Sequence, residues 1–508
     1  MGSDQSSVRG PFAGADEVAI VLPRDGKLLG DDGPQALAEL DALLRRERAE
    51  LELELGAPVR FADDDPGMGP RWLIGPAACN PALAHYGQRH GDDQAGLWLD
   101  RSRQVLVADA PDLDGIRETF NLLRTLRMSG AETVAASDCE TLGEAIPRTV
   151  TEVGYTYPSF GLRRLDWDAI CARHADRVRA AADPLAAMQQ WLAELHDAHT
   201  WVRAHPAPVP LPYHVWVDGA RGTATMTRVP PGTAAWDAGV RPGDALIGVD
   251  AAGWWARTAA PAHMRPLLAG YRLLSGPVGV AREFMARAPN GQMRPWTDAP
   301  TLAPAYPLVD WRRLSSGSGY LRIEAWRADL GADAAIDAAF DELAGSDRLI
   351  ADLRGNVGGN ATLALSFRDR FLRRRATLGS VRFSDGTGGL AAPAPIVGEP
   401  APAHRRWHGA VRFLTDPLTY SASEDALLGL QGLPHVGIVG EPSGGGSGRP
   451  RAVRLLPEMM LGVSTALTYD RQGRCVEGAG IPVDRPVTPD RFSPDDPDIV
   501  LLAADRDW

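Results

Sequence analysis

The chain has 508 residues, of which 44% are hydrophobic, and a formal net charge of −12 at pH 7. This is more apolar material than a single core usually holds, so we expect two or more domains. The acidic balance and the lack of a basic stripe exclude nucleic acid and an anionic membrane as expected partners. No apolar run is long enough to span a bilayer, so we expect no transmembrane segment.

The cysteines and the single lysine limit the kinds of site that the chain can form. The cysteines are scattered without CxxC spacing, so we expect free thiols and no metal site; they are Cys79, Cys139, Cys171 and Cys475. Lys27 is the only lysine, which excludes a Ser–Lys dyad in the C-terminal half. No pattern points to a cofactor. The first four residues lack a signal-peptide pattern. We therefore expect a cytoplasmic protein as the sequence is written, or a periplasmic or secreted one if a signal peptide was removed.

Residues 1–140 are predicted to form an α/β accessory domain. Short apolar runs predict strands at Val18–Leu22, Arg71–Ile74 and Val105–Ala108, and a long helix opens at Pro34.

Residues 131–150 have the composition of a linker. Residues 141–204 are predicted as a helical segment that carries His199. Its two helices lie between Trp167 and Trp201 and break at Ala181–Pro184.

Residues 205–290 are predicted to form a small β-rich insert. The run from Pro231 to Asp250 predicts a short helix ending at Gly239, a turn at Pro242–Asp244 and a strand. This run is similar to the PDZ domains of bacterial proteases, which take up a peptide as an added strand. The insert departs from them before Tyr213, where a proline-rich segment replaces the Gly-x-Gly-hydrophobic loop. A PDZ fold that serves as a rigid spacer is the alternative.

Residues 291–508 alternate between strand and helix patterns. Strands are expected at Gly319–Ile323, Arg348–Leu353, Val411–Leu414 and Val436–Val439, and helices at Leu330–Leu343, Leu363–Leu372 and Glu424–Leu430. This alternation predicts a βαβ-type layered domain, so the fold class of the whole chain is multidomain α/β.

A serine motif lies between a predicted strand and a helix, with the sequence Thr419-Tyr420-Ser421-Ala422-Ser423-Glu424. A serine at this junction can lie exposed on a tight turn, where the free amides of the helix start suit an oxyanion. A plain helix N-cap is the alternative.

A glycine-rich turn runs from Asp352 to Asn360. Its glycines let the backbone approach a ligand closely. A phosphate cradle would need a lysine and a hydroxyl after the last glycine, and Asn360-Ala361 follow instead. A nucleotide site is therefore not expected.

The third motif is Asp197-Ala198-His199-Thr200, at the end of a predicted helix. His199 is either structural, catalytic, or paired with His196 as two metal ligands that lack a third.

In order and spacing, these motifs resemble the S41 family of serine peptidases over residues 150–490. The segments Val439–Gly445 and Glu477–Asp484 look like later signatures of that family. The resemblance implies a spiral ClpP/crotonase-like fold for the C-terminal domain and hydrolysis of peptide bonds.

The resemblance also implies roles for individual residues. Ser421 is the expected nucleophile. The expected oxyanion donors are the amides of Ala422 and Gly358, with Gly359 as the alternative to Gly358. Buried charges at strand ends usually hold loops, and we interpret Asp352, Arg354 and Glu424 in that way.

The residue that serves as general base indicates which branch of the family the chain resembles. The processing-protease branch uses a lysine, and the corresponding segment here, Ser443–Gly448, has none. The chain thus resembles the tricorn-like branch, where His199 is the expected general base. In that branch a glutamate, here Glu477, orients the histidine, partly through a serine just before it. Ala198 stands at the position of that serine.

The expected activity is that of a serine endopeptidase or a carboxy-terminal processing peptidase acting on a peptide or protein. A non-catalytic protein of the same fold that binds a hydrophobic ligand or a peptide is one alternative, and a small-molecule esterase or amidase is another. A homo-oligomer is possible because this fold often assembles.

Overall fold

The computed structural model describes residues 10–23, 33–62, 65–75, 80, 83, 86, 95–110, 113–135, 139–304, 306–446, 448–495 and 497–506. Lys27 and Cys79 lie outside these residues. The chain divides into two compact units. The first comprises Met1–Thr156, Phe383–Ala392 and Arg451–Pro457, and the second comprises Tyr157–Arg382, Pro393–Pro450 and Glu458–Trp508.

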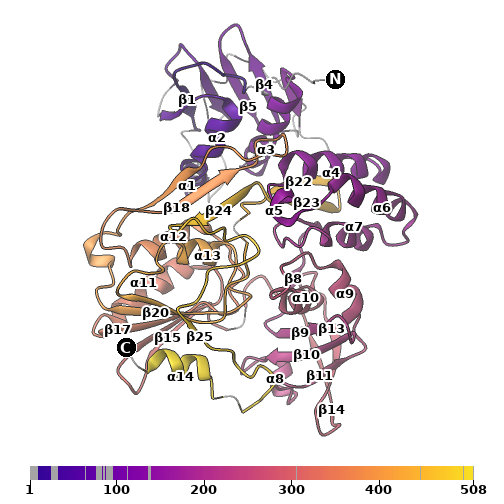
Figure 1. Cartoon of the computed structure of the whole chain (residues 1–508), viewed down its shortest axis with the longest axis vertical. Coiled ribbons are helices and arrows are strands. Elements are labelled where there is room, and N and C mark those ends of the chain that lie inside the picture. The colour runs from indigo at the N-terminus through magenta and orange to yellow at the C-terminus, as the bar shows by residue number, and fades with distance from the viewer. Residues whose placement is uncertain are drawn as a thin grey trace. The chain divides into compact units, whose positions relative to one another are not determined.

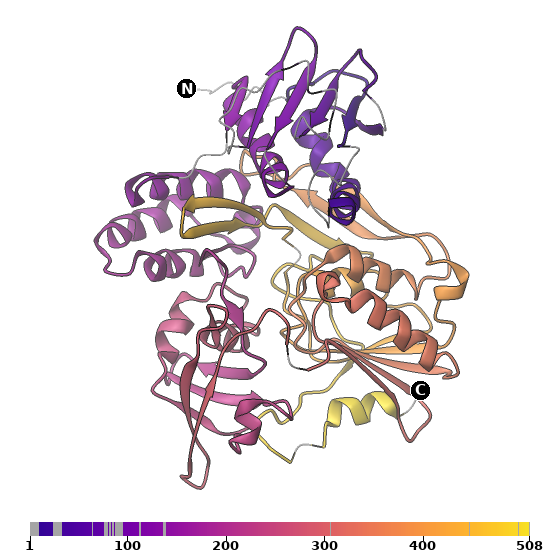
Figure 2. The ribbon, with the colours of Figure 1, turned by 180° about the vertical axis from the view of Figure 1, so that it is seen from behind.

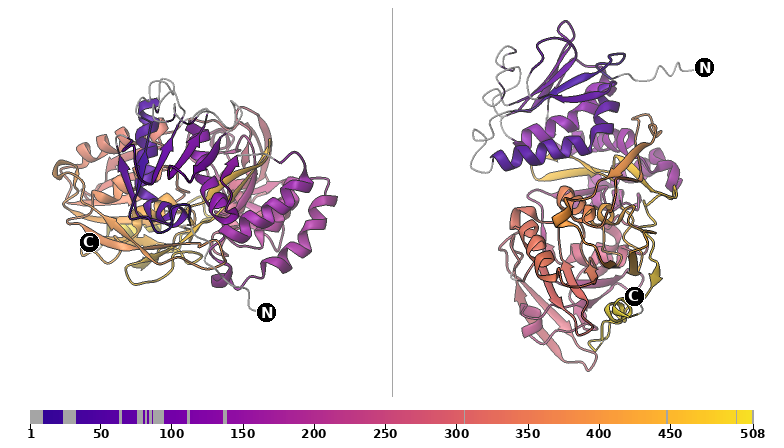
Figure 3. Two further views of the ribbon diagram at one scale, coloured as in Figure 1. Left: turned by 90° about the horizontal axis from the view of Figure 1, so that it is seen from above. Right: turned by 90° about the vertical axis from the view of Figure 1, so that its left-hand side faces the viewer.

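The first unit contains a six-stranded sheet in the order β2-β1-β3-β5-β4-β6. Its strands are β1 (Val18–Val21), β2 (Val59–Ala62), β3 (Arg71–Ile74), β4 (Gly96–Asp100), β5 (Val105–Asp109) and β6 (Thr133–Ala135). The helices α1 (Gly33–Arg46), α2 (Arg48–Leu55) and α3 (Leu113–Ser129) lie along one face of this sheet (Figure 3). The strands expected at residues 18, 71 and 105 are confirmed.

The predicted linker at residues 131–150 is wrong from residue 142 onwards. Residues 142–156 form a helix, α4 (Leu142–Thr156), although Pro147 lies inside it. Its buried face, which includes Ile146 and Val153, supplies the packing that outweighs the proline.

The segment Arg451–Pro457 is tied to the rest of the first unit by hydrogen bonds. Asn121 Nδ2 donates to the Ala452 carbonyl, and the Cys139 N–H donates to the Leu455 carbonyl at 2.8 Å. Ala452 and Leu455 lie in β22 (Arg451–Leu456). The domain boundary expected at residue 140 therefore has no counterpart in this division, because the unit continues to Thr156 and takes in chain from far downstream.

The second unit begins with three helices, α5 (Phe160–Arg163), α6 (Trp167–Ala180) and α7 (Pro184–Ala193). Asp166 and Asp183 cap α6 and α7 by accepting backbone N–H groups, so the expected break between them is confirmed. The next strand, β7 (Trp201–Ala204), pairs with β23 (Met459–Val463) from far along the sequence, which is the gold strand beside the purple helices in Figure 2.

The β-rich insert contains a five-stranded sheet in the order β14-β13-β11-β10-β9. Its elements are β8 (Val209–Pro210), β9 (His214–Asp218), β10 (Thr223–Arg228), α8 (Ala234–Asp237), β11 (Ala245–Ile247), α9 (Ala251–Arg257), α10 (Arg265–Leu273), β12 (Ser275–Gly276), β13 (Arg282–Arg287) and β14 (Met293–Asp298). The sheet continues past the expected limit of residue 290, because β13 and β14 form a hairpin.

The largest sheet of the second unit has the strand order β15-β16-β17-β20-β21-β25. Its strands are β15 (Val309–Arg313), β16 (Gly319–Ile323), β17 (Arg348–Asp352), β20 (Ala410–Thr415), β21 (Val436–Gly440) and β25 (Arg485–Pro486). All neighbours are parallel except β15 and β16.

Helices cover both faces of this sheet. One face packs against α11 (Ala332–Leu343), α12 (Ala361–Asp369) and α13 (Ala422–Leu427), and the other against α14 (Ile499–Asp505), as Figure 1 shows. The remaining elements are the short helices η3 (Ala328–Leu330) and η4 (Ala403–Arg405) and a three-stranded sheet of β18 (Ala376–Phe383), β19 (Ala394–Gly398) and β24 (Ala466–Asp470). The chain is thus a multidomain α/β protein, and the predicted strand–helix alternation is confirmed.

The parallel arrangement positions the candidate site. Strands β17 and β20 are neighbours, with Asp352 in register with Leu414. Since parallel strands end at the same edge of a sheet, the glycine-rich turn after β17 and the serine motif after β20 emerge side by side.

In the described part of the chain, no helix is long and apolar enough to cross a membrane.

Candidate active site

The glycine-rich turn is fastened directly to the serine motif. The Asn356 carbonyl accepts the Tyr420 N–H at 3.0 Å and the Ser423 hydroxyl at 3.0 Å. Ser423 also accepts the indole N–H of Trp326 at 2.9 Å. Ser423 is therefore a buried structural residue, and the turn and the motif form one rigid assembly.

Ser421 has the backbone conformation of a nucleophile on a sharp turn. Its φ is 58° and its ψ is −120°, directly before the first residue of α13. A non-glycine residue held at positive φ stores about 1–3 kcal/mol of strain, so the surroundings must hold it in place. The serine is half-buried, at the junction of a buried strand and a helix. This is the geometry that the strand–helix junction predicts.

The Glu424 carboxylate holds this strained turn. It accepts four hydrogen bonds, from the backbone N–H groups of Ser421, Gly445 and Gly446 and from the hydroxyl of Ser443. Burial raises the pKa of Glu424 to about 7, against these hydrogen bonds, which lower it. This geometry supports the predicted structural role of the glutamate.

His199 contacts Ser421. Its Nε2 lies 2.9 Å from Ser421 Oγ, although 222 positions separate the two residues in the sequence. Asp197 fixes the histidine backbone, because its Oδ1 accepts the His199 N–H at 2.8 Å and its Oδ2 accepts the Ser464 hydroxyl at 2.6 Å. Burial lowers the pKa of His199 below its ordinary value of 6.5, which keeps the ring neutral near pH 7.

The other ring nitrogen, Nδ1, has two neighbours. The Tyr420 hydroxyl lies 3.2 Å from it, and the Gly448 N–H donates to it at 3.3 Å. The ring centroids of His199 and Tyr420 lie 4.6 Å apart. In the sequence, the one signal that points to Tyr420 is its place next to Ser421.

Glu477 is buried, and among the described residues it makes no hydrogen bond to His199. Its Oε1 accepts a hydrogen bond from Arg163 Nη2 at 2.5 Å, and its Oε2 has no partner among the described residues. Burial raises the pKa of Glu477 well above its ordinary value. Glu477 and His199 are thus both buried, and no direct hydrogen bond joins them.

The candidate oxyanion donors differ in availability. The Gly358 N–H already donates to Asn356 Oδ1 at 3.0 Å. In the described part of the chain, the N–H groups of Gly359 and Ala422 make no hydrogen bond. The geometry therefore favours Gly359 over Gly358 as the partner of Ala422.

Gly358 has a steric role instead. A Cβ at this position would lie 2.9 Å from Ser421 Cβ, so only a glycine lets the turn approach the serine this closely.

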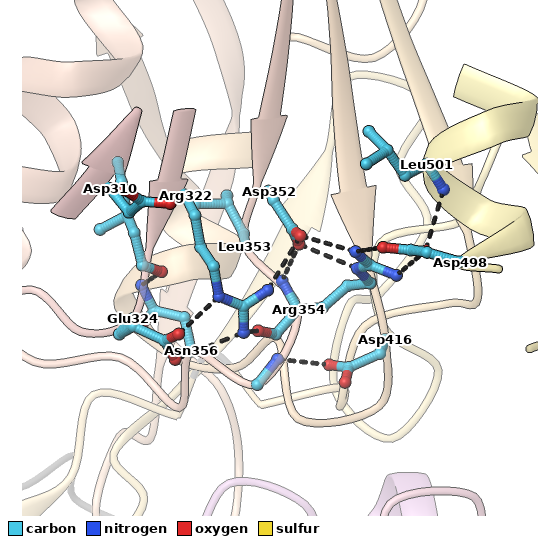
Figure 4. A network of polar contacts seen from close by, with 12 residues as sticks. Asp310, Arg322, Glu324, Asp352, Leu353, Arg354, Asn356, Asp416, Asp498 and Leu501 are labelled. Carbon is cyan, nitrogen blue, oxygen red and sulfur yellow. Dashed lines mark hydrogen bonds and ion pairs between the residues drawn. The ribbon is translucent and has the colours of Figure 1, made fainter. Parts of the chain in front are cut away.

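Asp352 anchors the base of the glycine-rich turn (Figure 4). Its carboxylate pairs with Arg322 at 2.9 Å and with Arg354 at 2.7 Å, and Arg354 reaches Asp498 at 2.8 Å. Burial alone would raise the pKa of Asp352, but the two guanidinium groups hold it far below its ordinary value. Among the described residues, neither Asp352 nor Arg354 makes a hydrogen bond to Ser421 or His199, which supports a structural role for both.

Within the described residues, no group of three His, Cys, Asp or Glu side chains is placed to hold a metal ion. Cys139, Cys171 and Cys475 are free thiols.

Residues 317–487, which include the glycine-rich turn, Ser421 and Glu477, match the model of peptidase family S41. This segment of the chain therefore resembles peptidase family S41. No curated protein matches the sequence significantly.

Several solved structures are similar to this chain at low sequence identity. Mature CPAF complexed with lactacystin matches with a TM-score of 0.50 and 14% identity, over 68% of this chain and 93% of that chain. The photosystem II D1 C-terminal processing protease gives a TM-score of 0.48, 19% identity and coverage of 72% and 97%. A putative peptidase from Parabacteroides merdae gives a TM-score of 0.43, 20% identity and coverage of 68% and 89%. The match over residues 317–487 indicates a serine-type peptidase, and it leaves the roles of individual residues to be argued from the geometry.

Proposed function

We propose that this chain is an S41 peptidase that hydrolyses peptide bonds through an acyl-enzyme on Ser421, with His199 as the general base. The observation that carries the proposal is the 2.9 Å contact between His199 Nε2 and Ser421 Oγ. A serine hydroxyl is a weak nucleophile at neutral pH, and a neutral imidazole within hydrogen-bond reach activates it. The lowered pKa of His199 keeps the imidazole in that form.

The reaction proceeds in two halves. Ser421 Oγ bonds to the carbonyl carbon while its proton passes to His199 Nε2. The carbonyl oxygen becomes an oxyanion, and the free N–H groups of Ala422 and Gly359 stabilise it, each contributing about 3 kcal/mol. His199 then gives its proton to the leaving amine as the peptide C–N bond breaks. A water molecule, deprotonated by His199, attacks the acyl-enzyme and releases Ser421.

The substrate on this proposal is a peptide or protein, cleaved either internally or near its carboxyl end. Since His199 supplies the base and no lysine lies in the segment that would carry one, we place the chain in the tricorn-like branch of the family.

The test is the separate replacement of both residues. Ser421→Ala and His199→Ala should each lower the kcat for a peptide substrate by at least about 1,000-fold. A fluorophosphonate probe should label the native enzyme and fail to label Ser421→Ala. The matched controls Ser102→Ala and His404→Ala change exposed residues and should keep full activity.

Undiminished hydrolysis in either active-site variant would remove the assignment. A native protein that neither cleaves peptides nor reacts with the probe would instead be a binding protein of the same fold. The acidic limb of the pH profile of kcat/KM should lie below pH 6.5, the ordinary histidine value, because burial lowers the pKa of His199.

A further inference from the structure

The surroundings of His199 Nδ1 raise a tautomer problem. A backbone N–H can only donate, so its contact from Gly448 belongs to the tautomer that carries its proton on Nε2. In that tautomer Nε2 donates to Ser421 Oγ and cannot take its proton. The reactive tautomer carries the proton on Nδ1, and it needs a hydrogen-bond acceptor there.

Within the described part of the chain, the Tyr420 hydroxyl is the one acceptor at hydrogen-bond distance from Nδ1. Among the described residues, no carboxylate makes a hydrogen bond to Nδ1. Asp197 binds the backbone of His199 and the Ser464 hydroxyl, and Glu477 binds Arg163. Ala198 has no polar side-chain atom to offer.

We propose that Tyr420 is the positioning residue of the general base, and that its hydroxyl oxygen accepts the Nδ1–H of His199 in the reactive state. The inference rests on the proposed function, because it assumes that His199 accepts the proton of Ser421.

The structure holds the Tyr420 hydroxyl in place from several sides. Only 5% of the residue is exposed, and its backbone N–H is fixed by the Asn356 carbonyl. Its ring lies against Gly444 and Gly446, where an added Cβ would overlap the ring or the hydroxyl. The Gly446 N–H is held in turn by Glu424 at 2.8 Å. The glycine-rich segment therefore provides the space that a tyrosine needs beside the histidine.

Tyr420 also stays protonated at every working pH. Burial is the main cause that raises its pKa well above its ordinary value, and the charges of Asp197 and Glu477 add to the effect. A neutral phenol can accept the Nδ1–H while it keeps its own proton. It therefore orients and stabilises the imidazolium without taking part in the proton transfer.

The test is Tyr420→Phe, which removes one oxygen atom and keeps the ring. We expect kcat to fall about 10- to 100-fold with KM nearly unchanged, because the lost hydrogen bond is made to a group that becomes charged in the transition state. The acidic limb should move down by about one pH unit, since an imidazolium without its acceptor loses its proton more easily. The charges acting on His199 come from Asp197 and Asp425, and both remain in the variant.

The matched control is Tyr213→Phe, which removes another largely buried hydroxyl, bonded to Asp298 in the insert. It should leave kcat and the acidic limb unchanged. If Tyr420→Phe does not fold, Gly446→Ala is measured instead, because its Cβ displaces the hydroxyl from Nδ1. The same downward shift of the limb is expected.

Two results would overturn the inference. One is a Tyr420→Phe enzyme with native kcat and native pH profile. The other is a loss of kcat with an unmoved acidic limb, which would mark a purely structural role. Each is read beside Ser421→Ala: if that variant is inactive, only the role of Tyr420 fails, and if it stays active, the proposed function itself fails.

Discussion

Replacing Gly358 with alanine tests how closely the glycine-rich turn must approach the nucleophile. The new Cβ would lie 2.9 Å from Ser421 Cβ, 3.1 Å from the Tyr420 carbonyl oxygen and 3.3 Å from the Ala422 nitrogen. Since nonbonded carbons settle about 3.5–4.0 Å apart, Ser421 or the turn must move by roughly 1 Å. A misplacement of about 1 Å at a reacting group costs about 100-fold in rate. We therefore expect Gly358→Ala to lower kcat about 100-fold.

The matched control is Gly473→Ala. Gly473 also has a positive φ, of 76°, but a Cβ there would meet no heavy atom within 4 Å. Both variants should lose stability through backbone strain, and only Gly358→Ala should lose hydrolysis of a peptide substrate and labelling by a fluorophosphonate probe. A Gly358→Ala enzyme that keeps native kcat would refute the inferred contact between turn and nucleophile.

Two further outcomes are expected. Glu424→Gln should lower the free energy of unfolding in urea by about 1–3 kcal/mol and should also lower kcat. The reason is that the amide NH2 of the new side chain would face donors that now bond to a carboxylate. A variant as stable as the native protein would contradict the role of Glu424 in holding Ser421. Glu324 gives a pH dependence: burial opposes its ionisation, but Arg322 and Arg228 lower its pKa to about 2. Its contribution to stability is therefore complete above its ordinary pKa of 4.5 and is lost as the pH falls from 4.5 towards 2. Unfolding free energies measured across that range should fall less steeply for Glu324→Gln, and an identical slope would argue against the pairing.

The sequence was sufficient to bring Ser421 and His199 together as a hypothesis. The alternation of strands and helices predicts parallel strands, and parallel strands deliver the glycine-rich turn and the serine motif to one edge. The position of His199 could be inferred only through the family resemblance, because no local pattern encodes a contact across 222 positions.

Other features could not be predicted, for physical reasons. Helix α4 contains Pro147, which local propensity penalises, and tertiary burial of Ile146 outweighs that penalty. Asn356 takes up the Gly358 N–H through a side-chain hydrogen bond that motif spacing does not reveal. The role of Tyr420 depends on which ring nitrogen its hydroxyl reaches, and that is decided by packing against Gly446.

The composition of the first unit limits how this enzyme can be shortened. A truncation that removed residues 1–156 would leave behind Phe383–Ala392 and Arg451–Pro457, which belong to that unit. Leu455, now fully buried, would become an exposed apolar side chain, and the carbonyl groups of Ser384 and Asp385 would lose the arginine donors Arg124 and Arg127. A shortened peptidase would therefore also need the segments Phe383–Ala392 and Arg451–Pro457 replaced by short polar loops, because the first unit is not continuous in the sequence.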